Sequence, residues 1–346
     1  MGYLGAVIGA GFASGQEIIQ FFVVYGSDGL KGTLLATFAF ALCGGMLLYL
    51  AHRHQVSNYQ DLLAGLMGNK GGKLIDWLLA AFLFLGISTM LSASGAVFEE
   101  HLYLPKSLGI LLTYLTVIFF LFSGKKGLIF SFNMLVPIKI IFLLIVTSYV
   151  VFFMESQALG SYSAYLCPVD SRLWIMSSIL YVAYNFSLAM VVLSEYQSLS
   201  NCREGIAGAA WGGLMLGILV VLSYLSLCKF LPVVMHYEVP MLYLMGRISP
   251  GVKQFYTLIL WIGILTTAIA NAYGFTQRIA DFSGLSFGSC LLLCMTLSLP
   301  LAMQSFSSLV GKIYPVFGLL GIIIISVLLY QGIKDMALLL YYNIKN

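Results

Sequence analysis

A succession of long apolar runs, separated by short polar connections, constrains this chain more than any single motif does. Each run has about the twenty residues that a helix needs to cross the hydrocarbon core of a bilayer. Charged residues make up only 9% of the 346 residues, against about 25% in soluble domains. We therefore expect a single-domain, all-α integral protein of the cell membrane with about ten transmembrane helices. Their expected ranges are 3–24, 31–51, 74–98, 107–123, 127–153, 173–199, 205–230, 252–279, 285–303 and 308–333.

Two longer connections and the ends of the chain set the expected topology. Residues 52–73 carry leucines at helical spacing and are expected to lie along the membrane surface. Residues 231–250 are expected to form a short cap. An even number of spans places both termini on one side, and a small excess of lysine and arginine favours the cytoplasm. Gly9 has only about eight residues before it, roughly 12 Å of helix, so we expect a few further residues before Met1.

Three glycines, a serine, an amide and a carboxylate interrupt the middle of the first apolar run. Glycine weakens a helix by about 1 kcal/mol relative to alanine, and backbone freed from a helix cannot face lipid. We therefore expect a non-helical stretch whose flanking half-helices point at a bound solute or ion. The alternative is a continuous helix whose small residues allow close packing. The candidate substrate-binding residues of this stretch are Gly9, Ala10, Gly11, Phe12, Ala13 and Ser14.

The sixth apolar run carries a second polar cluster at its middle. Five helices separate the two clusters, as two inverted five-helix repeats require. We expect this helix to be broken too and to form the other wall of the site, with Phe12, Tyr184 and Phe186 able to close it. The repeats would cover about 3–153 and 173–333, followed by a short tail, 334–346. The candidate substrate-binding residues of this helix are Tyr184, Asn185, Phe186 and Ser187.

Further polar side chains lie inside the other expected spans. Ser88 and Ser92 share a helix face, which indicates either a packing seam or a hydroxyl that reaches the substrate. Lys139 lies about 18 Å into its helix, too deep to reach water easily. Such a lysine is either a functional amine or a structural group bonded to helix-end carbonyls. Glu17 is also deep, and we expect it to carry a proton, gate the pathway or pair with another helix.

Thr266 and Thr267 are adjacent in the eighth span. Hydroxyls combined with free carbonyls suit a hard cation such as sodium, but threonines also bond back to their own helix. We expect no cofactor, with a sodium ion at these two threonines as the alternative.

Enzymatic and nucleic-acid functions have little support in the sequence. The stretch from Gly284 to Gly288 spells a nucleophile elbow, but it opens an apolar helix and follows no strand. Cys290 and Cys294 share a helix face without further ligands, so we interpret them as packing residues. We expect no enzyme, no metal centre and no nucleic-acid partner. The expected partners are a small-molecule substrate and the lipid bilayer, and the oligomeric state is left open.

The run from Val7 to Glu17 resembles the helix 1 signature of the YkvI-like membrane proteins, a bacterial group described as amino acid permeases. Residues 238–243 and 314–318 resemble later segments of that group. The group is similar to the amino acid–polyamine–organocation superfamily, which has the LeuT fold. The resemblance implies ten core helices in two inverted repeats, with helices 1 and 6 unwound around a central substrate.

The resemblance also implies two competing arrangements for the coupling ion. Thr266 and Thr267 match the hydroxyl residues that bind sodium in some superfamily members, and Lys139 matches by depth a lysine that replaces this ion in proton-coupled members. We expect the Lys139 amine to reach the helix 1 break and to exclude sodium, because two nearby cations repel strongly in a low-dielectric interior. We therefore expect a secondary transporter of an amino acid or a related zwitterion or carboxylate, with protons favoured over sodium. The alternative is a non-transporting sensor on the same fold.

Overall fold

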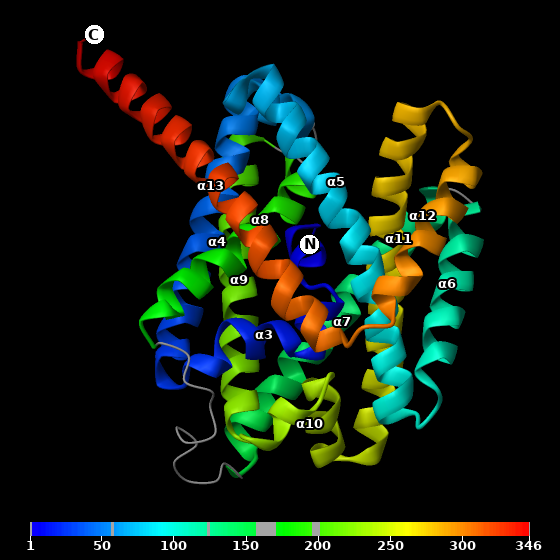
Figure 1. The fold of residues 1–346 in the computed structure, drawn as a ribbon. Coiled ribbons are helices and arrows are strands. Elements are labelled where there is room, and N and C mark those ends of the chain that lie inside the picture. Colours follow the sequence, from blue (N-terminus) through cyan, green and yellow to red (C-terminus); the bar gives the residue numbers. More distant parts are fainter. Residues whose placement is uncertain (1, 57–58, 123–124, 157–170, 196–200, 346) are drawn as a thin grey trace.

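The computed structural model describes residues 2–56, 59–122, 125–156, 171–195 and 201–345, and the described residues contain helices but no strand. The first half of the chain opens with three short helical pieces and continues with long helices (Figure 1). Its elements are α1 (Gly2–Val7), α2 (Ala10–Ser14), α3 (Gln16–Phe21), η1 (Val23–Tyr25), α4 (Ser27–His54), α5 (Tyr59–His101), α6 (Lys106–Phe122) and α7 (Lys125–Phe153).

The second half contains five long helices and a short helical cap. Its elements are η3 (Ser171–Leu173), α8 (Trp174–Glu195), α9 (Cys202–Cys228), η5 (Val233–His236), α10 (Pro240–Ile248), α11 (Pro250–Ser283), α12 (Phe287–Ala302) and α13 (Phe306–Lys345). Five of the described helices are long and apolar enough to cross a membrane, and four shorter ones are also apolar. Together with the segment α1–α3, these helices correspond to the ten expected spans.

Two helices extend beyond their expected ranges. The segment expected along the membrane surface is continuous with the third span in α5, and the chain changes direction at Gly68, whose φ of 76° lies outside the helical region. Glycine adopts positive φ without the steric cost that a Cβ imposes. At the other end of the chain, α13 continues to Lys345, and its last part projects away from the bundle (Figure 1).

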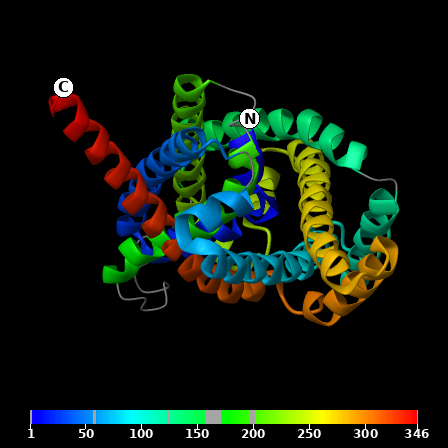
Figure 2. The ribbon, with the colours of Figure 1, turned by 90° about the horizontal axis from the view of Figure 1, so that it is seen from above.

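The first segment lies inside the bundle rather than at its surface. Seen from above, α1 lies between α9 and α11 (Figure 2), and it also packs against α8. Both Phe12 and Ile8 are fully buried. The unusual backbone of this segment is therefore surrounded by protein, as a membrane interior requires.

Glycines let the long helices approach one another closely around this segment. On α13, a Cβ added at Gly321 would overlap the carbonyl of Ala183 on α8. On α9, a Cβ at Gly213 would lie 2.5 Å from the backbone nitrogen of Ala41 on α4. Small residues at such contacts are typical of membrane helix pairs, whose association depends on close packing. The close packing positions α8 and α13 against the centre of the molecule.

Candidate functional site

The first spanning segment leaves the helical conformation twice. Ile8 and Gly9 separate α1 from α2, and Gly15, with φ of 87°, separates α2 from α3. The expected break at Gly9 is therefore present, but the expectation of a non-helical stretch as far as Ser14 is wrong. The Ala13 amide donates to the Gly9 carbonyl at 3.0 Å, so that residues 10–14 complete a helical turn of their own.

The break at Gly9 brings an amine and a hydroxyl to the freed backbone. The buried Lys139 amine donates a hydrogen bond to the Ile8 carbonyl. Thr267 Oγ1 would lie 3.8 Å from a Cβ at Gly9, and it donates to the Gly263 carbonyl at 2.9 Å. The amine therefore donates to the carbonyl that the interruption leaves without a donor from its own helix. Its role in coupling stays a prediction.

Thr266 and Thr267 do not face the same surroundings. Both hydroxyls donate to the Gly263 carbonyl at 2.9 Å, but Thr267 alone of the pair lines the central cavity described next. Successive residues of an α-helix are about 100° apart around its axis. The face of α11 that borders the cavity therefore presents Thr267 and not Thr266.

A small cavity lies between the first segment and four of the long helices. It leaves about 40 Å³ for the centres of water molecules, which is room for a few waters. A solute of amino acid size would therefore require the walls to move apart. The lining residues are Ala6, Val7, Gly9, Ala10, Gly11, Glu17, Phe82, Gly86, Met90, Tyr184, Asn185, Leu188, Thr267, Asn271 and Tyr314.

Glu17 is the acidic residue of this cavity. Its side chain is buried, with 3% exposed, and folds back over Gly11, where a Cβ would overlap Oε1. Tyr184 and Asn185 lie beside the carboxylate. Its Oε2 atom has no hydrogen-bond partner among the described residues. A buried polar atom without a partner requires an explanation, which a bound group or water can supply.

The sixth spanning helix is continuous, contrary to the expected break. α8 runs without interruption from Trp174 to Glu195. The Asn185 amide donates to the Tyr181 carbonyl at 3.1 Å, and the Ser187 hydroxyl donates to the Ala183 carbonyl at 2.8 Å. Asparagine and serine can bond to the preceding helical turn without opening it, and α8 contains no glycine.

Several other expected site residues lie away from the cavity. Ser92 donates to the Gln304 carbonyl at 2.6 Å and so connects α5 with the residues before α13. Ser14 donates to the Gly11 carbonyl at 2.8 Å, and the Ala13 carbonyl accepts a hydrogen bond from Tyr256. The following expected site residues are buried but do not line the cavity: Phe12, Ala13, Ser14, Ser88, Ser92, Lys139, Phe186 and Ser187.

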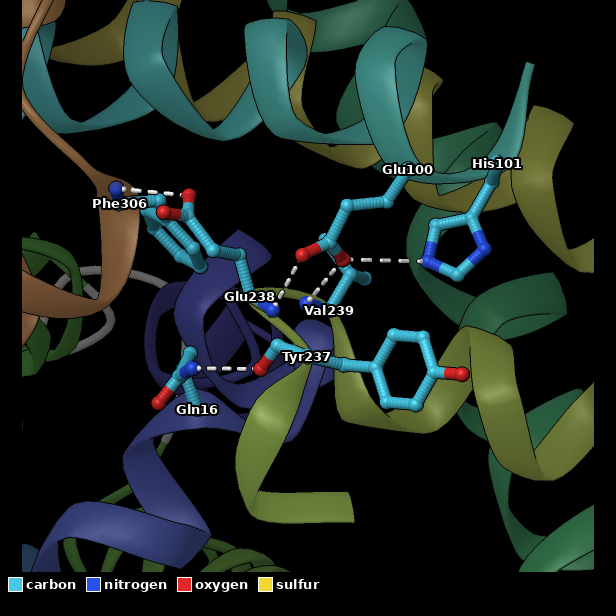
Figure 3. A network of polar contacts seen from close by, with 7 residues as sticks. All are labelled: Gln16, Glu100, His101, Tyr237, Glu238, Val239 and Phe306. Carbon is cyan, nitrogen blue, oxygen red and sulfur yellow. Dashed lines mark hydrogen bonds and ion pairs between the residues drawn. The ribbon is translucent and has the colours of Figure 1, made fainter. Parts of the chain in front are cut away.

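A network of carboxylate and amide contacts joins the segment before α10 to α3, α5 and α13 (Figure 3). The Glu100 carboxylate of α5 accepts from the backbone amides of Glu238 and Val239, at 2.8 Å and 3.2 Å. Glu238 in turn accepts from the Phe306 amide at the start of α13, at 2.9 Å. Gln16 of α3 donates to the Tyr237 carbonyl at 3.0 Å. We call the segment from η5 to α10 the cap.

The cap lies directly on the interrupted segment. Met241 of α10 approaches Gly15 so closely that its Cγ would lie 3.0 Å from a Cβ at that position. Partial burial raises the pKa of the Glu238 carboxyl above its ordinary value. The sequence predicted a cap in residues 231–250 but not the carboxylate contacts that hold it, because Glu100 and Phe306 lie far from Glu238 in the chain and no local pattern joins them.

The comparisons identify relatives of the whole chain. No model of a known protein family matches it. It is 33% identical over 330 residues to the uncharacterized membrane protein YkvI of Bacillus subtilis, covering 94% of this chain and 93% of that protein. Among solved structures it is similar to MhsT in complex with L-phenylalanine, with a TM-score of 0.65, 17% identity, and coverage of 94% and 86% of the two chains.

A second solved structure shows the same arrangement. The inward-facing conformation of Mhp1 matches with a TM-score of 0.60 and 13% identity, over 92% of this chain and 72% of that one. Both neighbours have the LeuT fold, so the expected fold class is confirmed. This chain is a multi-pass membrane protein of that fold, and within its described residues the first spanning segment is interrupted while α8 is continuous.

Proposed function

The chain belongs to the family of the membrane protein YkvI, and from this premise we propose that it is a secondary transporter. Its solute is small and polar, an amino acid or a related zwitterion or carboxylate. The observation that carries the proposal is the interrupted first segment, whose freed backbone at Ile8 and Gly9 adjoins a central cavity. Irregular backbone at this depth is typical of the substrate and ion sites of transporters.

The small size of the cavity and the position of the cap support alternating access. The cavity holds only a few waters, and the cap connects α3, α5 and α13 above it. A solute would enter from one side when the helices separate and leave from the other after they close. The walls come from both halves of the chain, so that a movement of one half against the other would open them.

Protons drive this transport through the Lys139 amine. The amine donates to the Ile8 carbonyl beside Gly9, and its side chain passes Gly263, whose carbonyl also receives the Thr267 hydroxyl. A buried lysine can exchange its proton when its surroundings change. While the amine is charged, a sodium ion at the same carbonyls would be repelled. Sodium coupling through Thr266 and Thr267 is the alternative.

The test is uptake into proteoliposomes with proton and sodium gradients imposed separately. A screen of amino acids and organic acids by thermal shift first supplies a ligand, because a ligand at 100 times its dissociation constant adds about 2.7 kcal/mol of stability. Lys139→Met should abolish proton-driven accumulation and leave exchange of bound solute less affected. Lys312→Met, which changes an exposed lysine, is the matched control and should behave as the unaltered protein.

Two results would contradict this proposal. Strict sodium dependence that Lys139→Met leaves unchanged would reject proton coupling. Ligand binding without accumulation under any gradient would reject transport and favour a membrane sensor on the same fold.

The orientation belongs to the same proposal. Both termini lie in the cytoplasm, and the exposed Cys202 at the start of α9 lies on that side too. A membrane-impermeant maleimide should therefore label Cys202 in opened membranes and not in intact cells. Labelling of Cys202 in intact cells, in a variant whose Cys167 is replaced, would invert the topology.

A further inference from the structure

Glu17 is a buried carboxyl group that the proposed transport cycle does not yet use. Its carboxylate lies at the cavity with 3% of the residue exposed, and Oε2 has no partner among the described residues. None of the ion pairs recorded in the described residues includes it. An uncompensated carboxylate in a membrane interior is costly, and such residues are usually paired with an opposite charge.

No side chain of the cavity supplies that opposite charge. Among the residues that the structure describes, its lining contains no lysine, arginine or histidine. The nearby Lys139 amine is bonded to the Ile8 carbonyl instead. The positive partner of Glu17 can therefore come from the solute.

The remaining lining suits an ammonium group. Phe82, Tyr184 and Tyr314 form an aromatic cluster beside the carboxylate, with Tyr184 and Tyr314 ring centroids 4.8 Å apart and Phe82 and Tyr314 centroids 6.0 Å apart. Aromatic faces attract cations, including quaternary and primary ammonium ligands. Asn185 and Asn271 also line the cavity, and each amide side chain carries a neutral acceptor oxygen.

In the part of the chain that the structure describes, α8 provides no half-helix end for a carboxylate. A break in helix 6 would have aimed the positive end of a half-helix at the solute, but α8 is continuous past Asn185. At Gly11 the absence of a Cβ makes room for the Glu17 carboxylate. This glycine therefore serves the placement of Glu17.

We infer that Glu17 binds the protonated amine of the transported solute, with Phe82, Tyr184 and Tyr314 around it. The inference rests on the proposed transport function and narrows its substrate class to amines, zwitterionic or cationic. Recognition depends on the amine, and a carboxylate in the solute is not required. The present space of about 40 Å³ accepts a group of the size of an ammonium, and the rest of the solute requires the walls to open.

The first experiment compares three sets of probes on the unaltered purified protein by calorimetry or thermal shift. The sets are the proteinogenic L-amino acids, the 2-hydroxy acids with the same side chains, and the corresponding amines without the carboxyl group. At least one amino acid and its amine should bind, and the 2-hydroxy acid should bind at least about 30-fold more weakly, since removing one partner of a buried charge pair costs about 2 kcal/mol or more.

The second experiment replaces the carboxylate. Glu17→Gln should weaken binding of the amine probes by about 30-fold or more and remove the preference for them over the 2-hydroxy acids. Glu99→Gln, which changes an exposed glutamate at the end of α5, should leave affinity and preference unchanged. The comparison of probe sets on the unaltered protein decides the matter even if Glu17→Gln does not fold.

Three outcomes overturn the inference. They are equal binding of 2-hydroxy acids and amino acids, absence of binding by every amine-bearing probe, and an amine preference that survives in Glu17→Gln. The last outcome would leave Glu17 as a proton carrier only. Accumulation of an amine-free acid in proteoliposomes would retain transport and reject this inference, whereas amine binding without accumulation would retain the inference and reject transport.

Discussion

The first spanning segment and α8 carry similar polar clusters at the middle of the membrane, but only the first leaves the helical conformation there. In the first segment Gly9 and Gly15 stand at the two interruptions, and Lys139 from α7 donates to the Ile8 carbonyl. In α8 the polar side chains of Asn185 and Ser187 bond to their own preceding turn. Polar residues in a span therefore do not open a helix unless another element satisfies the freed backbone.

The close contact of α8 with α13 gives the largest expected effect. A Cβ at Gly321 would overlap the Ala183 carbonyl, which is backbone and cannot rotate away. Gly321→Ala should therefore destabilise the protein by about 1–3 kcal/mol, measured as a lower melting temperature in detergent. Gly208→Ala, where a Cβ would meet nothing within 4 Å, is the control. Equal melting temperatures for the two variants would show that the straight α8 does not depend on this contact.

The second interruption of the first segment gives an intermediate effect. Gly15 has φ of 87°, and a left-handed residue with a Cβ costs about 1–2 kcal/mol. The same Cβ would also press on Met241 of the cap at 3.0 Å. Gly15→Ala should lower stability by about that amount and weaken ligand binding, as thermal shift with and without ligand would measure. A stability within error of the unaltered protein would show that the segment can bend without this conformation.

The first interruption and α8 should both tolerate small changes. Gly9 has φ of −82°, which any residue adopts, and a Cβ there would make only ordinary contact with Thr267 at 3.8 Å. Gly9→Ala should change stability by less than about 0.5 kcal/mol, and Ser187→Ala by about 1 kcal/mol, the net value of one hydrogen bond. Chemical denaturation would detect a larger change. A strong loss in Gly9→Ala alone would mean that the break needs glycine for more than its present geometry.

The fold could be predicted from the sequence to a large extent, because the thickness of the bilayer sets the length of each apolar run. The position of the break followed from the glycines, since few other residues weaken a helix in a spanning segment. The break predicted in α8 was wrong because side-chain bonds within a helix leave no trace in the pattern of residue types. Asn271 and Tyr314 were not predicted as site residues, since only the packing of α11 and α13 brings them to the cavity.

The cap has a mechanical consequence for the timing of movement at its end of the bundle. One short connection is bound at once to Gln16 of α3, Glu100 of α5 and Phe306 of α13. Each of these three helices must break its own hydrogen bonds to the cap before it can withdraw from it. We therefore expect opening at this end to require the release of one shared connection from three helices, which disfavours states in which a single helix has moved away.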